Sequence, residues 1–224
     1  MKTPSQKSVL WVGSSKKDLQ LLPDEVQDVF GYALHLAQSG EKHPDAKPLK
    51  GFGGARVLEV VENYATNAYR AVYTVRFDTA VYVLHVFQKK SNSGIATPKP
   101  DVEKIRERLK IAEKEAEMTP NIEISSGNIY ADLEMPDAET RQLKAQLASK
   151  ITDIIKHKRM TQTEAARLLG MTQPKLSHLL RGQFRGISET KMLECLTLLG
   201  RDVQIVIGKS RRTPKAGSLN VIFS

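Results

Sequence analysis

The stretch MTQTEAARLLGMTQPKLSHLLRG, residues 160–182, constrains the fold more tightly than any other part of the chain. Thr161 stands three residues before Glu164, which is the spacing of a capping box at the start of a helix. Gly170 can adopt the left-handed conformation that a tight turn between two helices requires. Thr172 can then cap a second helix. The helices expected in this part of the chain cover about residues 143–155, 162–169, 173–181 and 189–199.

The second helix of this pair has an apolar and a polar side. Leu176, Leu179 and Leu180 share the inward side at helical spacing. The side chains left pointing outward are those of Gln173, Lys175, Ser177 and His178. A helix that enters the major groove of DNA needs such donors and acceptors near its N-terminus.

This stretch resembles the Cro/repressor-type helix-turn-helix, and the resemblance covers about residues 141–200. It implies that DNA bases are contacted by Gln162, Gln173, Lys175 and His178. It implies phosphate contacts by Arg181, Lys191 and the helix N-termini. The alternative is a helix pair that only folds, with its polar side chains solvated.

The first part of the chain, to about residue 117, mixes strand and helix patterns. Apolar residues recur at helical spacing between Pro23 and Gly40, and again at about 102–112. Residues 69–77 alternate with the period of a strand. We therefore expect an α+β domain, with a small antiparallel sheet and flanking helices, followed by an all-α helix-turn-helix domain with a short C-terminal strand. The expected strands cover residues 9–12, 57–64, 69–77 and 80–88, with the late strand at 202–208.

One face of the expected sheet is basic. A two-residue hairpin turn at residues 78–79 would pair Arg70 with Phe87. In that register His85 is a diagonal neighbour of Arg70, and Lys89 continues the same face. Cations beside an imidazole suit phosphodiester chemistry on RNA, because the cations stabilise phosphate charge while the imidazole moves a proton. The alternative is a surface cluster around a histidine with satisfied hydrogen bonds.

The segments KPLKGFGGARVLEVVEN, YRAVYTVRF and YVLHVFQKKSNSGIATP look like the RelE/HigB superfamily of bacterial toxins, over about residues 8–116. Members are small α+β proteins, many of which cleave mRNA in the ribosomal A site without a metal ion. The resemblance implies catalytic roles for Lys50, Arg70, His85 and Lys89, with Lys47, Tyr73 and Lys90 as weaker candidates. Relatives often have Glu-Leu-Arg where this chain has Glu-Val-Val at 59–61. The missing arginine favours the alternative of a domain that has lost catalysis and serves dimerisation or sensing.

The third part of the chain resembles HigA-type antitoxins, through SSGNIYADLEMPD, a long helix, the helix-turn-helix and GRDVQIVIG. Such antitoxins are usually encoded by the adjacent gene, and Met118 lies where a separate antitoxin could begin. Residues 118–140 between the two parts carry five carboxylates and no lysine or arginine. We interpret them as an inhibitory segment that lies across the basic sheet face and occupies the site meant for RNA. The alternative is a solvated linker.

Charge and composition limit the partners. The chain carries a formal net charge of +9, and after Thr140 sixteen lysines and arginines stand against five acidic residues, which favours polyanionic partners. Residues 209–224 form a basic tail. No signal peptide or membrane span is expected, and a single cysteine agrees with a reducing cytoplasm. The five histidines lack zinc-ligand spacing, so we expect no metal and no cofactor.

The sequence therefore predicts a cytoplasmic, homodimeric toxin–antitoxin protein in one chain, with domains at 1–117 and 141–208. We expect it to bind operator DNA, and the ribosome and mRNA are further expected partners. One alternative is a purely DNA-binding regulator with a catalytically dead toxin-like domain. Another is an active, ribosome-directed endoribonuclease that uses the basic third part to bind RNA.

Overall fold

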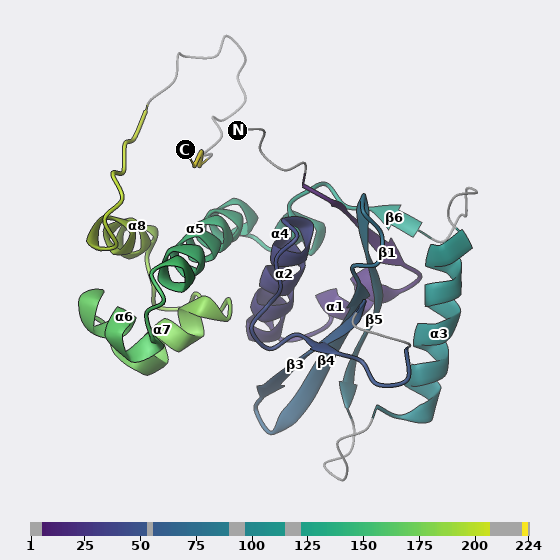
Figure 1. The fold of residues 1–224 in the computed structure, drawn as a ribbon. Coiled ribbons are helices and arrows are strands. Elements are labelled where there is room, and N and C mark those ends of the chain that lie inside the picture. The colour runs from purple at the N-terminus through teal and green to yellow at the C-terminus, as the bar shows by residue number, and fades with distance from the viewer. Residues whose placement is uncertain (1–5, 53–55, 90–96, 115–121, 207–220, 224) are drawn as a thin grey trace. The chain divides into compact units, whose positions relative to one another are not determined.

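The computed structural model describes residues 6–52, 56–89, 97–114, 122–206 and 221–223. The chain divides into two compact units, Met1–Ala138 and Glu139–Ser224. The first unit contains a sheet with helices, and the second is helical (Figure 1). The described helices include none with the length and apolar character that crossing a bilayer demands.

The first unit is built on a six-stranded sheet in the order β2-β3-β4-β5-β1-β6. β1 runs parallel to β5, and the other neighbouring strands are antiparallel. The expected all-antiparallel sheet is therefore wrong at this one pair, because an apolar run does not show which strand it will pair with. The strands are β1 Ser8–Val12, β2 Lys47–Pro48, β3 Val57–Tyr64, β4 Asn67–Thr74, β5 Ala80–Lys89 and β6 Ile122–Ile124.

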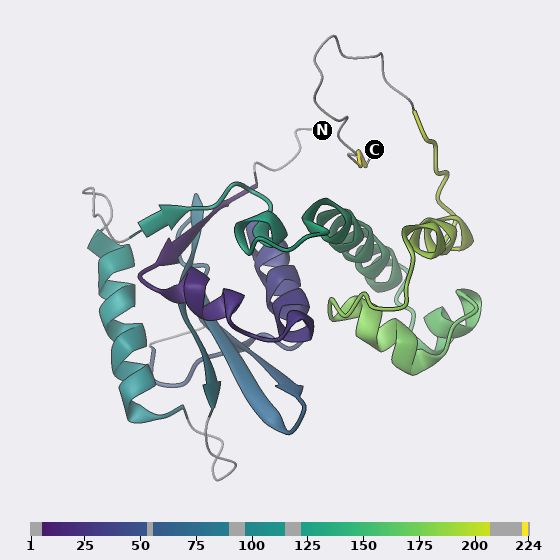
Figure 2. The ribbon, with the colours of Figure 1, turned by 180° about the vertical axis from the view of Figure 1, so that it is seen from behind.

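Helices cover both faces of this sheet. Figures 1 and 2 show α2 (Asp24–Gln38) on one face and α3 (Lys99–Lys114) on the opposite face. Because both faces are covered, β1 and β5 are apolar along nearly their whole length. The expected strands 57–64 and 80–88 and the helices at α2 and α3 are confirmed. The sequence did not predict β2, β6, α1 (Ser15–Gln20) or the single-turn α4 (Ile129–Asp132).

A β-bulge interrupts the pairing of β4 with β5. Arg70 pairs with Phe87, as predicted, but the register shifts between Val72 and Tyr73 so that β5 contributes one extra residue, Leu84. The expected two-residue turn is wrong, because β4 ends at Thr74 and β5 begins at Ala80. A bulge places two residues of one strand opposite one of the other. Leu84 and His85 consequently both face α3.

The second unit consists of α5 (Ala138–His157), α6 (Gln162–Leu168), α7 (Gln173–Leu180) and α8 (Glu189–Leu198). The capping box of Thr161 with Glu164 is complete, and Thr172 Oγ1 accepts a hydrogen bond from the backbone N–H of Lys175. Gly170 has φ +62°, the left-handed conformation that the turn was expected to need. The predicted helix pair is confirmed.

The late strand expected at 202–208 is wrong for its described part. Residues 201–206 form no helix and no strand. A β-rich sequence becomes a strand only where another strand offers hydrogen bonds, and the sheet of the described residues contains no strand from this segment. Residues 207 and 208 and most of the basic tail, up to residue 220, lie outside the described residues.

Candidate functional site

The outward side of the helix-turn-helix carries two linked glutamines. Gln162 is the first residue of α6 and Gln173 is the first residue of α7, and both side chains are exposed. Gln173 Nε2 donates a hydrogen bond to Gln162 Oε1 over 2.8 Å. The link holds two side-chain amides side by side at the start of two helices. Each amide keeps donor and acceptor groups for an edge of a base.

Cationic side chains flank this glutamine pair. Lys175 and His178 are exposed on α7, whereas Ser177 is half-buried and the leucines Leu176, Leu179 and Leu180 are buried, as predicted. Lys175 also lines a shallow concavity together with Arg167 and Lys191. Arg181 is half-buried at the end of α7. Hydrogen-bonding amides suit the edges of bases, and cations suit the phosphates of a duplex.

The sheet of the first unit brings Arg70 and His85 to its α3 face. His85 Nε2 lies 2.9 Å from Asp101 Oδ1, on the first turn of α3, and the imidazole stacks on Phe87 with ring centroids 4.8 Å apart. Arg70 Nη1 lies 2.5 Å from Glu59 Oε2 on the neighbouring strand β3. Each of the two candidate catalytic groups therefore already contacts a carboxylate of its own unit.

Both groups are buried beneath α3 and its preceding residues. The residue exposures are 7% for Arg70 and 3% for His85, and Arg70 Nη1 also reaches Thr97 Oγ1 at 3.4 Å. The pKa of His85 is lowered, chiefly because burial penalises the charged imidazole, although the hydrogen bond with Asp101 opposes the shift. His85 Nδ1 is buried and has no hydrogen-bond partner among the described residues. The imidazole is thus neutral near pH 7 and shielded from solvent.

The other candidate residues are either less buried than this pair or lie on the other face of the sheet. Lys50 and Lys47 are exposed at β2 and its following loop, and Lys89 is half-buried at the end of β5. Tyr73 alternates onto the opposite face of β4 from Arg70, and burial raises its pKa. Lys90 and Met118 lie outside the described residues.

Sequence reasoning missed the two carboxylates of the site, Glu59 and Asp101. Asp101 could have been found from its place in the first turn of a helix, where carboxylates are favoured. Nothing in the sequence alone shows that this turn lies over His85.

The described part of the acidic segment up to Ala138, residues 122–138, folds as part of the first unit. β6 pairs antiparallel with β1, and Lys16 Nζ lies 2.5 Å from Glu123 Oε1. Asp132, at the end of α4, accepts hydrogen bonds from Trp11 Nε1 at 3.2 Å and from the backbone N–H of Ser126 at 2.9 Å. The segment is held by main-chain pairing, by charge and by a buried carboxylate together.

Two side chains of α4 are fully buried. Ile129 and Tyr130 both have 0% exposure. Tyr130 lies against Gly31 of α2 so closely that a Cβ on Gly31 would come within 2.7 Å of the tyrosine ring. The absence of a side chain at Gly31 thus makes the space that the tyrosine fills.

This placement differs from the expectation that the acidic segment covers the basic sheet face. β6 lies beyond β1, two strands from β5, and α4 packs on α2, whereas Arg70 and His85 face α3. The carboxylates at Arg70 and His85 are instead those of Glu59 and Asp101. The expectation rested on opposite charge, and charge alone does not show on which face of a sheet a segment packs.

Comparisons with known proteins match both parts of the chain. Residues 129–208 match the family model described as a helix-turn-helix domain, and residues 17–110 match the one described as phage-derived protein Gp49-like. A solved structure described as a candidate XRE-family transcriptional regulator is 38% identical, over 40% of this chain and 100% of that chain, with a TM-score of 0.37. No curated protein matches the chain.

Proposed function

We propose that this chain, which joins a helix-turn-helix domain of DNA-binding regulators to a Gp49-like domain, is a toxin–antitoxin protein that binds operator DNA. Its second unit is the HigA-type antitoxin and regulator. Its first unit is a RelE/HigB-type toxin domain kept silent. The proposed regulatory role rests mainly on one observation. Gln162 and Gln173, at the starts of α6 and α7, are exposed and hydrogen-bonded to each other.

The glutamine pair favours sequence-specific binding over general affinity for polyanions. A glutamine can make two hydrogen bonds to adenine in the major groove, and a good contact of this kind is worth about 1–3 kcal/mol of discrimination. The link to Gln162 fixes the side chain of Gln173 before DNA arrives, which reduces the entropy cost of ordering it. One helix-turn-helix makes few base contacts, so we expect a dimer on two half-sites about 34 Å apart.

The test selects duplexes from a random pool with the full-length protein and compares Gln173→Ala with Gln88→Ala. Gln88 is an exposed glutamine on β5 of the first unit and is the matched control. Gln173→Ala should weaken the selected duplex about 5- to 150-fold and relax one base position. Gln88→Ala should leave binding unchanged. If the wild-type protein selects no sequence at moderate salt, the regulatory role is wrong.

The proposal that the first unit is held inactive as a ribonuclease is supported by contacts within that unit. Arg70 and His85 are held by Glu59 and Asp101, and α3 covers them. In the proposed RNA cleavage, Arg70 with Lys50 and Lys89 would stabilise the phosphate, and His85 would move the proton. Neither Arg70 nor His85 can reach RNA while α3 stays in place. Silencing would therefore come from α3, with the acidic segment fastening the edge of the sheet.

A second candidate function is a first unit without catalysis that serves dimerisation or sensing. The burial of Arg70 and His85 favours it, because RNA would have to displace a helix to reach them. Expressing residues 1–138, the complete first unit, and following growth separates the two candidates. Arrest that Arg70→Ala or Lys89→Ala relieves, while the exposed Arg76→Ala does not, favours a toxin. Lack of arrest from soluble, folded 1–138 favours the second candidate.

A further inference from the structure

Helix α3 covers Arg70 and His85, and one arginine of this helix points into the first unit. Arg108, in the second half of α3, has a side chain that is only 12% exposed. Its Nη1 donates a hydrogen bond of 2.9 Å to the backbone carbonyl of Leu84 on β5. Leu84 is the residue that the β-bulge leaves without a partner on β4, so its carbonyl can accept a bond from α3 directly beside His85.

The same guanidinium also contacts the start of α1. Arg108 Nη2 donates a hydrogen bond of 2.6 Å to Ser14 Oγ, and this hydroxyl donates one of 2.8 Å to Asp18 Oδ2. The turn before α1 leaves space for the arginine, since Gly13 has φ +60° and a Cβ there would come within 3.1 Å of Arg108 Nε. A largely buried guanidinium that loses its acceptors keeps an uncompensated charge, so breaking these contacts is costly.

Helix α1 is in turn attached to the acidic segment near both of its ends. Lys16 Nζ, near the start of α1, lies 2.5 Å from Glu123 Oε1 of β6. Gln20 Nε2, at the end of α1, donates a hydrogen bond of 3.3 Å to the backbone carbonyl of Asp132. A contiguous series of contacts therefore runs from the acidic segment through α1 to α3.

Other contacts also hold α3 on the sheet. Ile105 and Ala112 are buried in the core, but they are the only buried residues among the 16 of this helix. Glu113, near its end, pairs with Arg76, and this exposed ion pair contributes little. Because the apolar packing of α3 is limited, the contacts of Arg108 should decide how readily the helix opens.

We infer that Arg108 is a positioning residue through which the acidic segment, acting by way of α1, keeps α3 closed over Arg70 and His85. The segment does not need to touch the sheet face, because it holds the helix whose first turn accepts a bond from Arg108. Opening of α3 is a local unfolding step, and contacts that are lost on opening oppose it. The inference rests on the proposed function for its purpose, since a site for RNA is what α3 would cover. Its test needs no RNA.

The first experiment follows hydrogen–deuterium exchange of the full-length protein by mass spectrometry and compares Arg108→Ala with Lys110→Ala. Lys110 is exposed on the same helix and is the matched control. Arg108→Ala should speed exchange of the α3 amides at least about 10-fold, because two hydrogen bonds from a charged group are lost. Lys110→Ala should change it less than about 2-fold. Unchanged exchange in β3 and β4 separates opening of α3 from unfolding of the unit.

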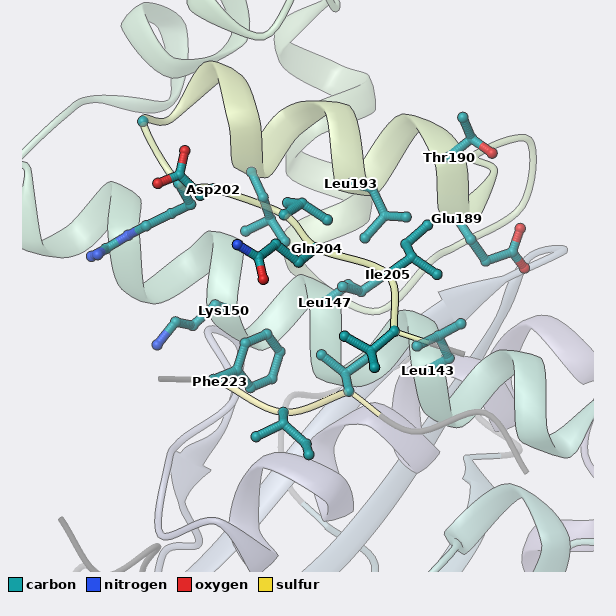
Figure 3. Close-up of a pocket in the computed structure, with 17 residues that line it drawn as sticks. Leu143, Leu147, Lys150, Glu189, Thr190, Leu193, Asp202, Gln204, Ile205 and Phe223 are labelled. Carbon is teal, nitrogen blue, oxygen red and sulfur yellow. The ribbon is translucent and has the colours of Figure 1, made fainter. Parts of the chain in front are cut away.

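The second unit supplies an internal reference for these measurements. Figure 3 shows its apolar groove between α5 and α8, with Leu147 and Leu193 in the wall and Phe223 beside Lys150. The groove is lined by residues of the second unit alone. The amides of α5 and α8 should therefore exchange alike in all variants.

The second experiment tests the connection through α1. Lys16→Ala combined with Gln20→Ala removes the two contacts of α1 with the acidic segment, and Lys17→Ala is the control on an exposed position of the same helix. The double substitution should speed exchange of the α3 amides about 3- to 10-fold, although it leaves Arg108 and its acceptors in place. In an Arg108→Ala background it should add less than about 2-fold, because the connection is already broken.

A third measurement links α3 to the buried site. Diethyl pyrocarbonate modifies accessible imidazoles, and the exposed His157 of the second unit is the internal reference. Relative to His157, the buried His85 should react about 10-fold faster in Arg108→Ala than in the wild type, since opening of α3 exposes it.

The results can overturn the inference in several ways. Wild-type exchange of α3 or wild-type modification of His85 in Arg108→Ala contradicts it. So does a pair Lys16→Ala with Gln20→Ala that has no effect, or an equal effect in both backgrounds. Arg108→Lys keeps the charge but cannot reach both acceptors as a fork, so it should speed exchange less and replaces Arg108→Ala if that variant unfolds the unit.

Growth separates the inference from the proposed function. If the first unit is a ribonuclease, Arg108→Ala should make the full-length chain arrest growth, and adding Arg70→Ala should relieve the arrest. The expected exchange without growth arrest leaves the inference standing and counts against the proposed ribonuclease.

Discussion

Two isoleucines of the acidic segment make a matched pair for testing how that segment is held. Ile129 of α4 has 0% exposure, whereas Ile124 of β6 is 72% exposed. Ile129→Ala and Ile124→Ala delete the same atoms within six residues of one another. If the segment folds as part of the first unit, the two substitutions should differ strongly. If it is a solvated linker, both substitutions should leave the free energy of unfolding nearly unchanged.

The expected costs follow from burial. Truncating a fully buried isoleucine to alanine typically lowers the free energy of unfolding by about 2–5 kcal/mol, since transfer energy is lost and a cavity remains. For Ile124 most of the side chain stays in water in both states, so we expect less than about 1 kcal/mol. With a urea dependence of about 2 kcal/mol per molar, Ile129→Ala should lower the unfolding midpoint by roughly 1–2.5 M.

The fluorescence of Trp11 can be used to follow the unfolding of the first unit. Trp11 is the only tryptophan of the chain, it is buried in β1, and its Nε1 donates a hydrogen bond to Asp132 at the end of α4. Its fluorescence during urea unfolding of the full-length protein therefore reports the first unit alone. Equal midpoint shifts for the two variants, or no shift with Ile129→Ala, would refute the claim that α4 belongs to this fold.

Two further predictions concern buried histidines. Burial lowers the pKa of His35 to about 4 from an ordinary 6.5, so the unfolded chain binds a proton more readily between these values. The stability of the first unit, followed by Trp11 fluorescence, should fall as pH drops from 6.5 to 5, by roughly 2 kcal/mol from this group, and His35→Gln should flatten the decline. Asp101→Asn should lower the pKa of His85 further in an NMR titration, because both the hydrogen bond and the charge of Asp101 raise it.

The helix-turn-helix could be predicted almost completely from the sequence, because its determinants are local. The side chains of Thr161 and Thr172 cap backbone groups three residues away, and Gly170 sets the turn by its own conformation. These helix caps and this turn do not depend on residues far away in the sequence. Outward and inward sides then follow from helical spacing, which is why the exposed glutamines were found before the fold was known.

The sheet site could be predicted only in part, because its decisive features come from tertiary contacts. The pairing of Arg70 with Phe87 follows from alternation, and the structure has it. The bulge does not follow from alternation, and it brings Leu84 to the α3 face, where His85 already lies through its pairing with Val72. Asp101 meets His85 only because α3 crosses that part of the sheet. Local patterns therefore predict the strands but not the burial of the site.

The acidic segment shows why joining both parts in one chain matters physically. Ile129, Tyr130, Leu133 and Met135 are buried where the segment docks on the first unit. At about 1.5–3 kcal/mol each, their burial contributes on the order of 6–12 kcal/mol before any cost of ordering. Association of two separate chains costs an estimated 4–15 kcal/mol or more in lost freedom, so this segment alone would bind weakly as a free peptide. A short covalent connection removes most of that cost, since docking becomes intramolecular at a high effective concentration. In one chain a single-turn helix and a three-residue strand are enough to complete the edge of the sheet.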